Sequence, residues 1–182
     1  GSRTFDDEFV APAEPFALVG GGRRIEISFG EGYPYAQVYA PDDDDVIAFG
    51  YHPYFRLPGI ERSAWAVEIP VSERVVLDSE ELPTGAVEKT DAFAGPLGSR
   101  TFDDEFAAPG EPFVLAGGGR RIEVSFVRGY PYAQIYAPED DEVIAFEPMT
   151  APTNALVSGR DLNLLQPGES YEASFSVTVM SA

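Results

Sequence analysis

The stretch YEASFSVTV (171–179) alternates apolar and polar side chains at every step. Side chains two apart in a β-strand lie on the same face, so this pattern predicts a strand with one apolar side. RIEISF (24–29) and RIEVSF (121–126) carry the same alternation. The three segments together predict an antiparallel sheet with one buried face and one solvent-facing side.

Further short segments rich in β-branched and aromatic residues predict additional strands. They are AQVYA (36–40), AQIYA (133–137), VIAF (46–49 and 143–146), AWAVEI (64–69) and RVVL (74–77). Turns rich in glycine and proline separate these segments at short intervals, and the sequence shows no amphipathic helix pattern. The predicted fold class is therefore all-β, a single antiparallel β-sandwich domain over residues 1–182.

The sequence contains a long internal repeat. Residues 1–49 align with residues 98–146 without a gap, and 39 of the 49 positions are identical. Old duplications diverge further than this, so we interpret the repeat as the sign of an engineered, internally duplicated chain. Two near-identical units also predict a pseudo-twofold arrangement, in which equivalent strands end in equivalent places.

Composition excludes several kinds of function. A formal charge of −19, with one lysine in the chain, opposes binding to nucleic acid or to an anionic membrane. The chain has no cysteine and one histidine, which excludes disulfides and a multi-histidine metal site within one chain. We expect a cytoplasmic protein without metal or cofactor, and an exposed edge strand as the route to a homodimer.

Two residues suited to proton transfer follow the two copies of VIAF. His52 lies three residues after Phe49, and Glu147 lies one residue after Phe146. If a pseudo-twofold axis passes near these strand ends, the imidazole and the carboxylate meet. Pattern alone favours a structural histidine among aromatic residues and an ordinary surface glutamate.

Acidic side chains gather in two other segments. TFDDEF (101–106) places Asp103 and Asp104 between phenylalanines, and strand alternation puts one of them in solvent without saying which. The aspartate run 42–45 lacks the alternating ligands and the distal glutamate of a calcium loop. We interpret that run as the solvated tip of a hairpin.

Four motifs in this order resemble the C-terminal half of bacterial aldose 1-epimerases, the galactose mutarotase family. They are HPYFRLPG (52–59), TFDDEF (101–106), QIYAP (134–138) and FEPMTAPTNAL (146–156), and LQPGESYEASFSV (165–177) is similar to the family's closing strands. The resemblance implies a fragment of the family's β-supersandwich. It also implies an isomerase that interconverts the α and β anomers of free sugars without a cofactor.

The resemblance implies roles for four residues. Glu147 takes the proton from the anomeric hydroxyl, and His52 protonates the ring oxygen. Asp103 binds sugar hydroxyls, and Gln134 is a further pocket-lining candidate. The chemistry agrees, because a histidine titrates near neutrality and a glutamate between apolar neighbours can have its pKa raised toward working pH.

The sequence departs from the family in its first 49 residues. They resemble a second copy of the later segment, whereas the family's N-terminal half supplies an arginine and a second histidine to the pocket. We therefore predict an engineered β-sandwich with weak or absent mutarotase activity and residual binding of a free monosaccharide. The alternatives are an active aldose 1-epimerase and a carbohydrate-binding module without turnover.

Overall fold

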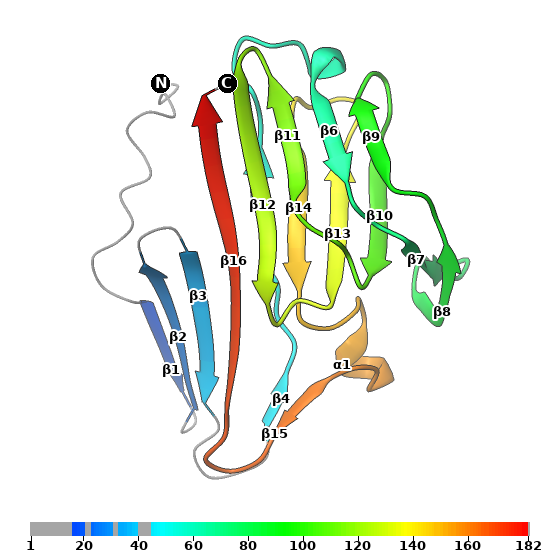
Figure 1. The fold of residues 1–182 in the computed structure, drawn as a ribbon. Helices are drawn as coiled ribbons and strands as arrows, with labels where there is room; N and C mark the ends of the chain where they lie inside the picture. Colours follow the sequence, from blue (N-terminus) through cyan, green and yellow to red (C-terminus); the bar gives the residue numbers. More distant parts are fainter. Residues whose placement is uncertain (1–15, 21–22, 31–32, 40–44, 182) are drawn as a thin grey trace.

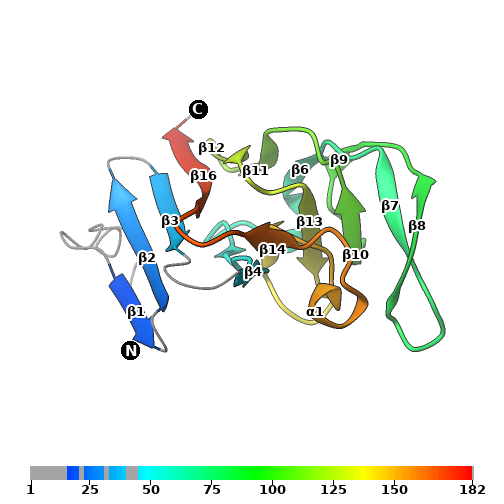
Figure 2. The same ribbon diagram turned by 90° about the horizontal axis from the view of Figure 1, so that it is seen from below.

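The computed structural model describes residues 16–20, 23–30, 33–39 and 45–181, with side chains from Ala48 onward. Two antiparallel sheets pack face to face, and a two-stranded ribbon lies at one end (Figures 1 and 2). The predicted all-β sandwich is confirmed. The first GSRTFDDEF copy (1–9) and positions 42–44 of the aspartate run lie outside the described residues.

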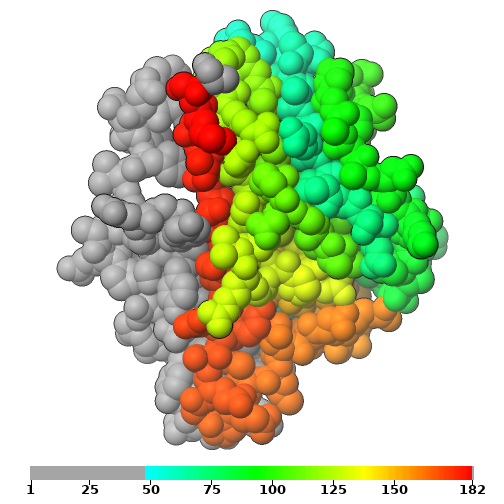
Figure 3. Space-filling view, in the orientation of Figure 1, coloured from blue at the N-terminus to red at the C-terminus, as the bar shows by residue number. Residues whose placement is uncertain are grey.

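The larger sheet has eight strands in the order β1-β2-β3-β16-β12-β11-β6-β9. Their bounds are β1 Phe16–Gly20, β2 Arg23–Gly30, β3 Tyr33–Tyr39, β6 Ala66–Ile69, β9 Phe93–Pro96, β11 Phe113–Gly117, β12 Arg120–Arg128 and β16 Ser170–Ser181. The twelve-residue strand β16 lies between β3 and β12 and links the first copy of the repeat to the second. Figure 3 shows β16 running beside β12 along one face of the molecule.

The second sheet has six strands in the order β5-β14-β13-β10-β7-β8. Their bounds are β5 Tyr54–Phe55, β7 Glu73–Leu77, β8 Pro83–Lys89, β10 Phe102–Ala107, β13 Tyr132–Ala137 and β14 Ile144–Met149. The ribbon pairs β4 (Asp45–Ile47) with β15 (Asn163–Leu165), and the short helix α1 (Ala155–Ser158) lies between β14 and β15 in the chain. A 3-10 turn, Arg62–Ala64, precedes β6.

Alternation along β16 follows the sequence prediction over most of the strand. Ala173 and Phe175 are buried, and Tyr171 and Val177 are half-buried. Val179 departs from the prediction and is 68% exposed. The reason lies in the pairing, because β3 reaches only residues 170–174 and leaves the end of β16 with β12 as its one described neighbour.

The core lies between the two sheets, under β12, β11 and β6 on one side and β13 and β14 on the other. Its largest fully buried side chains are Trp65, Phe113, Phe146, Ile69, Leu97, Leu115, Ile135 and Ile144. Phe113 stacks on Phe146 across the sandwich, with ring centroids 5.4 Å apart. Inward-facing residues of β13 alternate with outward-facing Tyr132, Gln134 and Tyr136, which leaves the outer face of the second sheet polar.

The two copies of the repeat form the same hairpin. Phe16 pairs with Ile27 in β1–β2, and Phe113 pairs with Val124 in β11–β12. The other paired positions of the two hairpins also correspond one to one. The repeated sequence therefore fixes this local register in both copies.

After the hairpin the two copies diverge. In the first copy, β3 turns back and pairs with β2 in the larger sheet. In the second, β13 crosses to the other sheet and pairs with β10 and β14, while β16 takes the place beside β12. Arg128 of β12 donates to Glu172 of β16 at 2.7 Å, and the first copy has Glu31 at the position that corresponds to Arg128.

The predicted pseudo-twofold arrangement is therefore wrong for the described residues. The equivalent strands β4 and β14 pair with different partners, because β4 pairs with β15 whereas β14 pairs with β13 and β5. Equivalent sequences end in different places because the neighbours available to each strand differ. The internal repeat extends to the first hairpin of each copy and not to the pairing of the strands that follow.

Candidate functional site

His52 lies directly across from Glu147 because the segment after β4 runs antiparallel to β14. Gly50 forms an isolated bridge with Met149, and the backbone N–H of Tyr51 donates to Pro148 O at 3.1 Å. Pairing continues in the same register at β5, where Tyr54 opposes Ala145. The imidazole and the carboxylate therefore meet through strand pairing and not through a twofold axis.

The two side chains are in close contact. His52 Nε2 lies 3.2 Å from Glu147 Oε1, and the two side chains are 49% and 11% exposed respectively. The contact lacks hydrogen-bond geometry, and Oε1 is buried with no hydrogen-bond partner among the described residues. Glu147 thus forms the inner side of the pair, and His52 forms the side open to solvent.

Aromatic rings hold the imidazole from two directions. The ring of Tyr54 stacks on His52 at a centroid distance of 4.4 Å, and its hydroxyl lies 3.3 Å from Nε2. Tyr136 contacts the imidazole edge-on at 6.2 Å. Stacking and a polar contact together restrict the rotation of His52 toward solvent.

Burial raises the pKa of Glu147 from an ordinary 4.5 to about 7, and the nearby charge of Asp103 adds to the effect. Desolvation disfavours the charged carboxylate, and a like charge acts in the same direction. A protonated His52 at this distance favours the carboxylate and opposes both causes. Burial and the Asp103 charge thus bring the pKa of Glu147 close to neutrality, the range that suits general acid–base chemistry.

Asp103 and Gln134 join the pair on the outer face of the second sheet. Gln134 opposes Glu147 in the β13–β14 ladder, and its side-chain amide donates to Asp103 Oδ1 at 2.8 Å. The structure also separates the two aspartates that sequence spacing left open. Asp103 is exposed on this polar face, whereas Asp104 accepts from Arg74 at 3.1 Å. All four predicted site residues thus lie on one face.

Sequence reasoning missed Glu105, which occupies the same face. Glu105 opposes Gln134 in the β10–β13 ladder, is 3% exposed and accepts from the backbone N–H of Thr153 at 3.2 Å. Burial raises its pKa, and the bonds from Thr153 act in the opposite direction. A signal was present in the sequence, because Glu105 is two residues from Asp103 and strand alternation puts both on one side.

The connection between β14 and β15 contacts the same face at a second point, besides the bond from Thr153 to Glu105. Tyr132 opposes Met149 in the β13–β14 ladder and donates its hydroxyl to Asp161 Oδ2 at 2.5 Å. Arg160 extends from this loop toward β8, with its guanidinium against Gly85. The polar face is thus bordered by the β14–β15 connection on the side of β10, β7 and β8.

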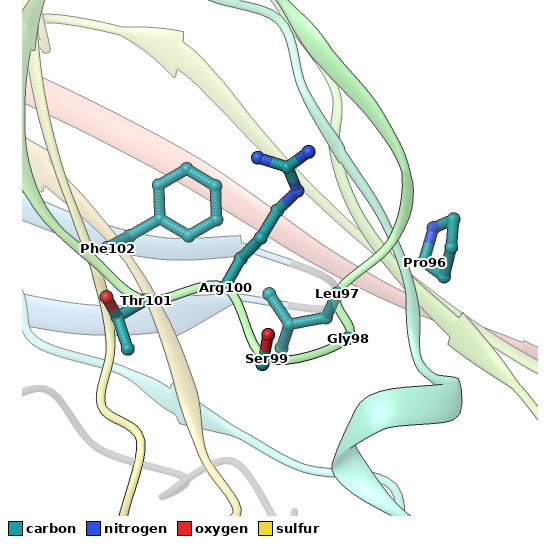
Figure 4. Close-up of a pocket in the computed structure, with 7 residues that line it drawn as sticks. All are labelled: Pro96, Leu97, Gly98, Ser99, Arg100, Thr101 and Phe102. Atoms are coloured by element: carbon teal, nitrogen blue, oxygen red, sulfur yellow. The ribbon is translucent and has the colours of Figure 1, made fainter.

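Two hollows lie away from this polar face. Residues 96–102, at the turn between β9 and β10, line one of about 640 Å³, where Arg100 and Phe102 point to the same side (Figure 4). The other, of about 380 Å³, is lined by residues 72–73 and 89–91. Neither contains a predicted site residue.

Within the described part of the chain no cluster of three His, Asp or Glu side chains is placed to hold a metal. No helix of that part is long and apolar enough to cross a bilayer.

Comparison with known proteins places the fold. A family model for aldose 1-epimerase matches residues 36–178. The chain superposes on a galactose mutarotase-like protein from Clostridium acetobutylicum with a TM-score of 0.71 and 16% identity, covering 92% of this chain and 62% of that one. No curated protein matches the sequence.

Two further solved structures give the same result. An aldose epimerase homologue from C. elegans has a TM-score of 0.69 and 14% identity, covering 92% of this chain and 69% of that one. Galactose 1-epimerase from Lactobacillus acidophilus has a TM-score of 0.66 and 14% identity, with 92% and 62% covered. The chain therefore spans less than two thirds of the Clostridium and Lactobacillus proteins, and at these identities the likeness shows the fold alone. Because the family model covers most of its length, the chain belongs to the aldose 1-epimerase family.

Proposed function

We propose that this chain binds a free monosaccharide on the polar outer face of the second sheet and interconverts its anomers. The observation that carries the proposal is the contact of His52 Nε2 with Glu147 Oε1 at 3.2 Å, beside the Asp103–Gln134 pair. Proton donor and acceptor therefore share one site with groups that hydrogen-bond hydroxyls. Carboxylate, amide and tyrosine side chains suit a neutral polyol and oppose an anionic ligand.

The reaction needs two coupled proton transfers. The Glu147 carboxylate takes the proton of the anomeric hydroxyl, the bond from C1 to the ring oxygen breaks, and protonated His52 gives its proton to that oxygen. The product is the open-chain aldehyde with a free hydroxyl. Rotation about the C1–C2 bond and reversal of both transfers close the other anomer and restore both residues. The sugar must separate the two side chains, since its two reacting oxygens lie between them.

Polarimetry of freshly dissolved α-D-glucose and α-D-galactose tests this proposal, in dilute buffer because buffers also catalyse anomer exchange. Wild-type protein is expected to shorten the approach to equilibrium, and the His52→Ala, Glu147→Gln double variant is expected to match buffer. Asp104→Asn is the matched control, since Asp104 contacts Arg74 and none of the four site residues. Equal rates of anomer exchange for the wild type and the double variant would refute the proposed catalysis.

The second candidate is an engineered, duplicated β-sandwich with weak or absent mutarotase activity and residual sugar binding. The identity of 39 of 49 residues between the copies supports an engineered origin, and the single histidine supports weak catalysis. Under this candidate, NMR titration with galactose shifts signals of the polar face while polarimetry stays at the buffer rate. Chemical-shift changes that Asp103→Asn weakens would separate specific binding from a general solvent effect.

A further inference from the structure

Thr150 makes an unusual set of bonds at the start of the segment that carries His52. Its side chain is fully buried, and its hydroxyl accepts from Phe49 N–H and donates to Phe49 O, each at 2.9 Å. The backbone N–H of Thr150 also donates to Phe49 O at 2.9 Å. One residue thus satisfies both polar backbone groups of Phe49.

Ahead of β5, the one other backbone hydrogen bond from this segment to β14 among the described residues runs from Tyr51 N–H to Pro148 O. Pro53 and Pro148 have no N–H, so each removes a donor from the ladder. Gly50 shows how close the two strands lie, because a Cβ there would be 2.8 Å from Pro148 O. The Thr150 bonds and the Tyr51 bond therefore fix the register at this end of the segment, and the β5–β14 pairs fix it at the other end.

Register decides whether His52 faces Glu147. Side chains alternate between the two faces of a strand, so a slip of one residue would turn His52 toward the core and Tyr51 toward the polar face. Thr150 and Phe49 oppose each other three positions from the His52–Glu147 pair, along the same two antiparallel segments. Fixing one end of so short a segment fixes the position of His52.

We propose that Thr150 is a positioning residue for the His52–Glu147 pair and acts through the backbone of Phe49. The catalytic consequence rests on the proposed function, whereas the geometric consequence does not. Loss of the hydroxyl lets the segment shift on β14 and uncouples the imidazole from the carboxylate. A displacement of this kind lowers kcat by about 10- to 100-fold, with a smaller effect on KM.

The single histidine makes the geometry measurable without any activity. The ring signals of His52 are recorded by NMR in the wild-type and Thr150→Val chains, each with and without Glu147→Gln. We expect Glu147→Gln to move the ring signals in the wild-type chain and to leave them unchanged in the Thr150→Val chain. Thr150→Ser retains the hydroxyl and is expected to restore the response.

Thr153→Val is the matched control, because Thr153 is exposed and its hydrogen bonds go to Glu105. An undiminished response to Glu147→Gln in Thr150→Val overturns the proposal. If Thr150→Val does not fold, the test rests on Thr150→Ser. A folded Thr150→Ser chain whose His52 signals do not respond to Glu147→Gln also overturns the proposal. A wild-type chain that shows the response but no acceleration in polarimetry refutes the proposed function and leaves the positioning role standing.

Discussion

Glu105 and Glu147 lie on either side of Gln134, in one line across strands β10, β13 and β14. Both carboxylates are buried, and burial raises the pKa of each. The amide between them donates to Asp103, which is exposed. One line of paired residues therefore holds two carboxylates that resist ionisation, on a face otherwise open to solvent.

The stability of the protein should depend on pH through Glu147. Its pKa is raised from 4.5 in the unfolded chain to about 7 in the folded state, so the folded state binds the proton more tightly. The unfolding free energy is then highest below about pH 4.5 and falls as pH rises through 7, by at most about 3 kcal/mol. Urea denaturation between pH 4 and 9 measures this fall.

Glu147→Gln should remove most of that dependence, because glutamine does not ionise. Glu139→Gln is the control, since Glu139 is exposed at a turn of the same sheet. Identical pH profiles for wild type and Glu147→Gln would contradict the assigned cause.

Glu105 should be more tolerant of amidation than of truncation. Glutamine at this position keeps an acceptor for the Thr153 N–H and carries no charge to desolvate, so Glu105→Gln is expected to equal or exceed the wild-type melting temperature at pH 8. Glu105→Ala leaves that N–H without its acceptor and opens a cavity, at a cost of about 1–3 kcal/mol. A Glu105→Gln chain less stable than Glu105→Ala would show that the charge itself stabilises the fold.

Sugar binding should distinguish the two neighbouring aspartates. Asp103→Asn is expected to weaken galactose binding about tenfold in NMR titration, through loss of a charged acceptor on the polar face. Asp104→Asn should leave binding unchanged and cost at most about 1 kcal/mol, because its ion pair with Arg74 is partly exposed. Equal losses in both variants would point to a change in β10 as a whole.

Exchanging residues between the repeat copies should cost stability where the second copy is tightly packed. Gly110→Ala introduces the residue of the first copy, and the new Cβ would lie 2.9 Å from Pro70 O. Gly110 N also donates to that carbonyl at 2.6 Å, so the backbone has little room to yield, and we expect a loss of about 1–3 kcal/mol. Glu139→Asp makes the same kind of exchange at an exposed position and should be neutral in thermal unfolding.

Periodicity in the sequence was enough to predict several of the long strands, whereas β5, β8, β9 and β15 were not predicted. RIEVSF, AQIYA and YEASFSVTV lie within β12, β13 and β16 respectively. Alternation of apolar and polar residues is a local property, so it does not depend on which neighbouring strand a segment pairs with. Partner choice is not local, and the pairing of β13 with β10 and β14 depends on segments far away in the chain.

The candidate site shows the same limit. Motif resemblance named His52, Glu147, Asp103 and Gln134, and the structure places all four on one face. The way in which His52 comes to face Glu147 was not predictable. The expected twofold symmetry was wrong, and the two residues meet because a short segment runs antiparallel to β14. Thr150 was missed because a buried hydroxyl that bonds a distant backbone leaves no periodic signal in the sequence.

The shared register of hairpins β1–β2 and β11–β12 has a consequence for how the chain folds. Both hairpins are built from contacts close in sequence, which form early, whereas the pairing of β12 with β16 closes a long loop and forms late. We therefore expect two similar folding nuclei. Because corresponding strands of the two hairpins are nearly identical in sequence, we expect mispaired hairpins to be the kinetic trap that this repeat creates.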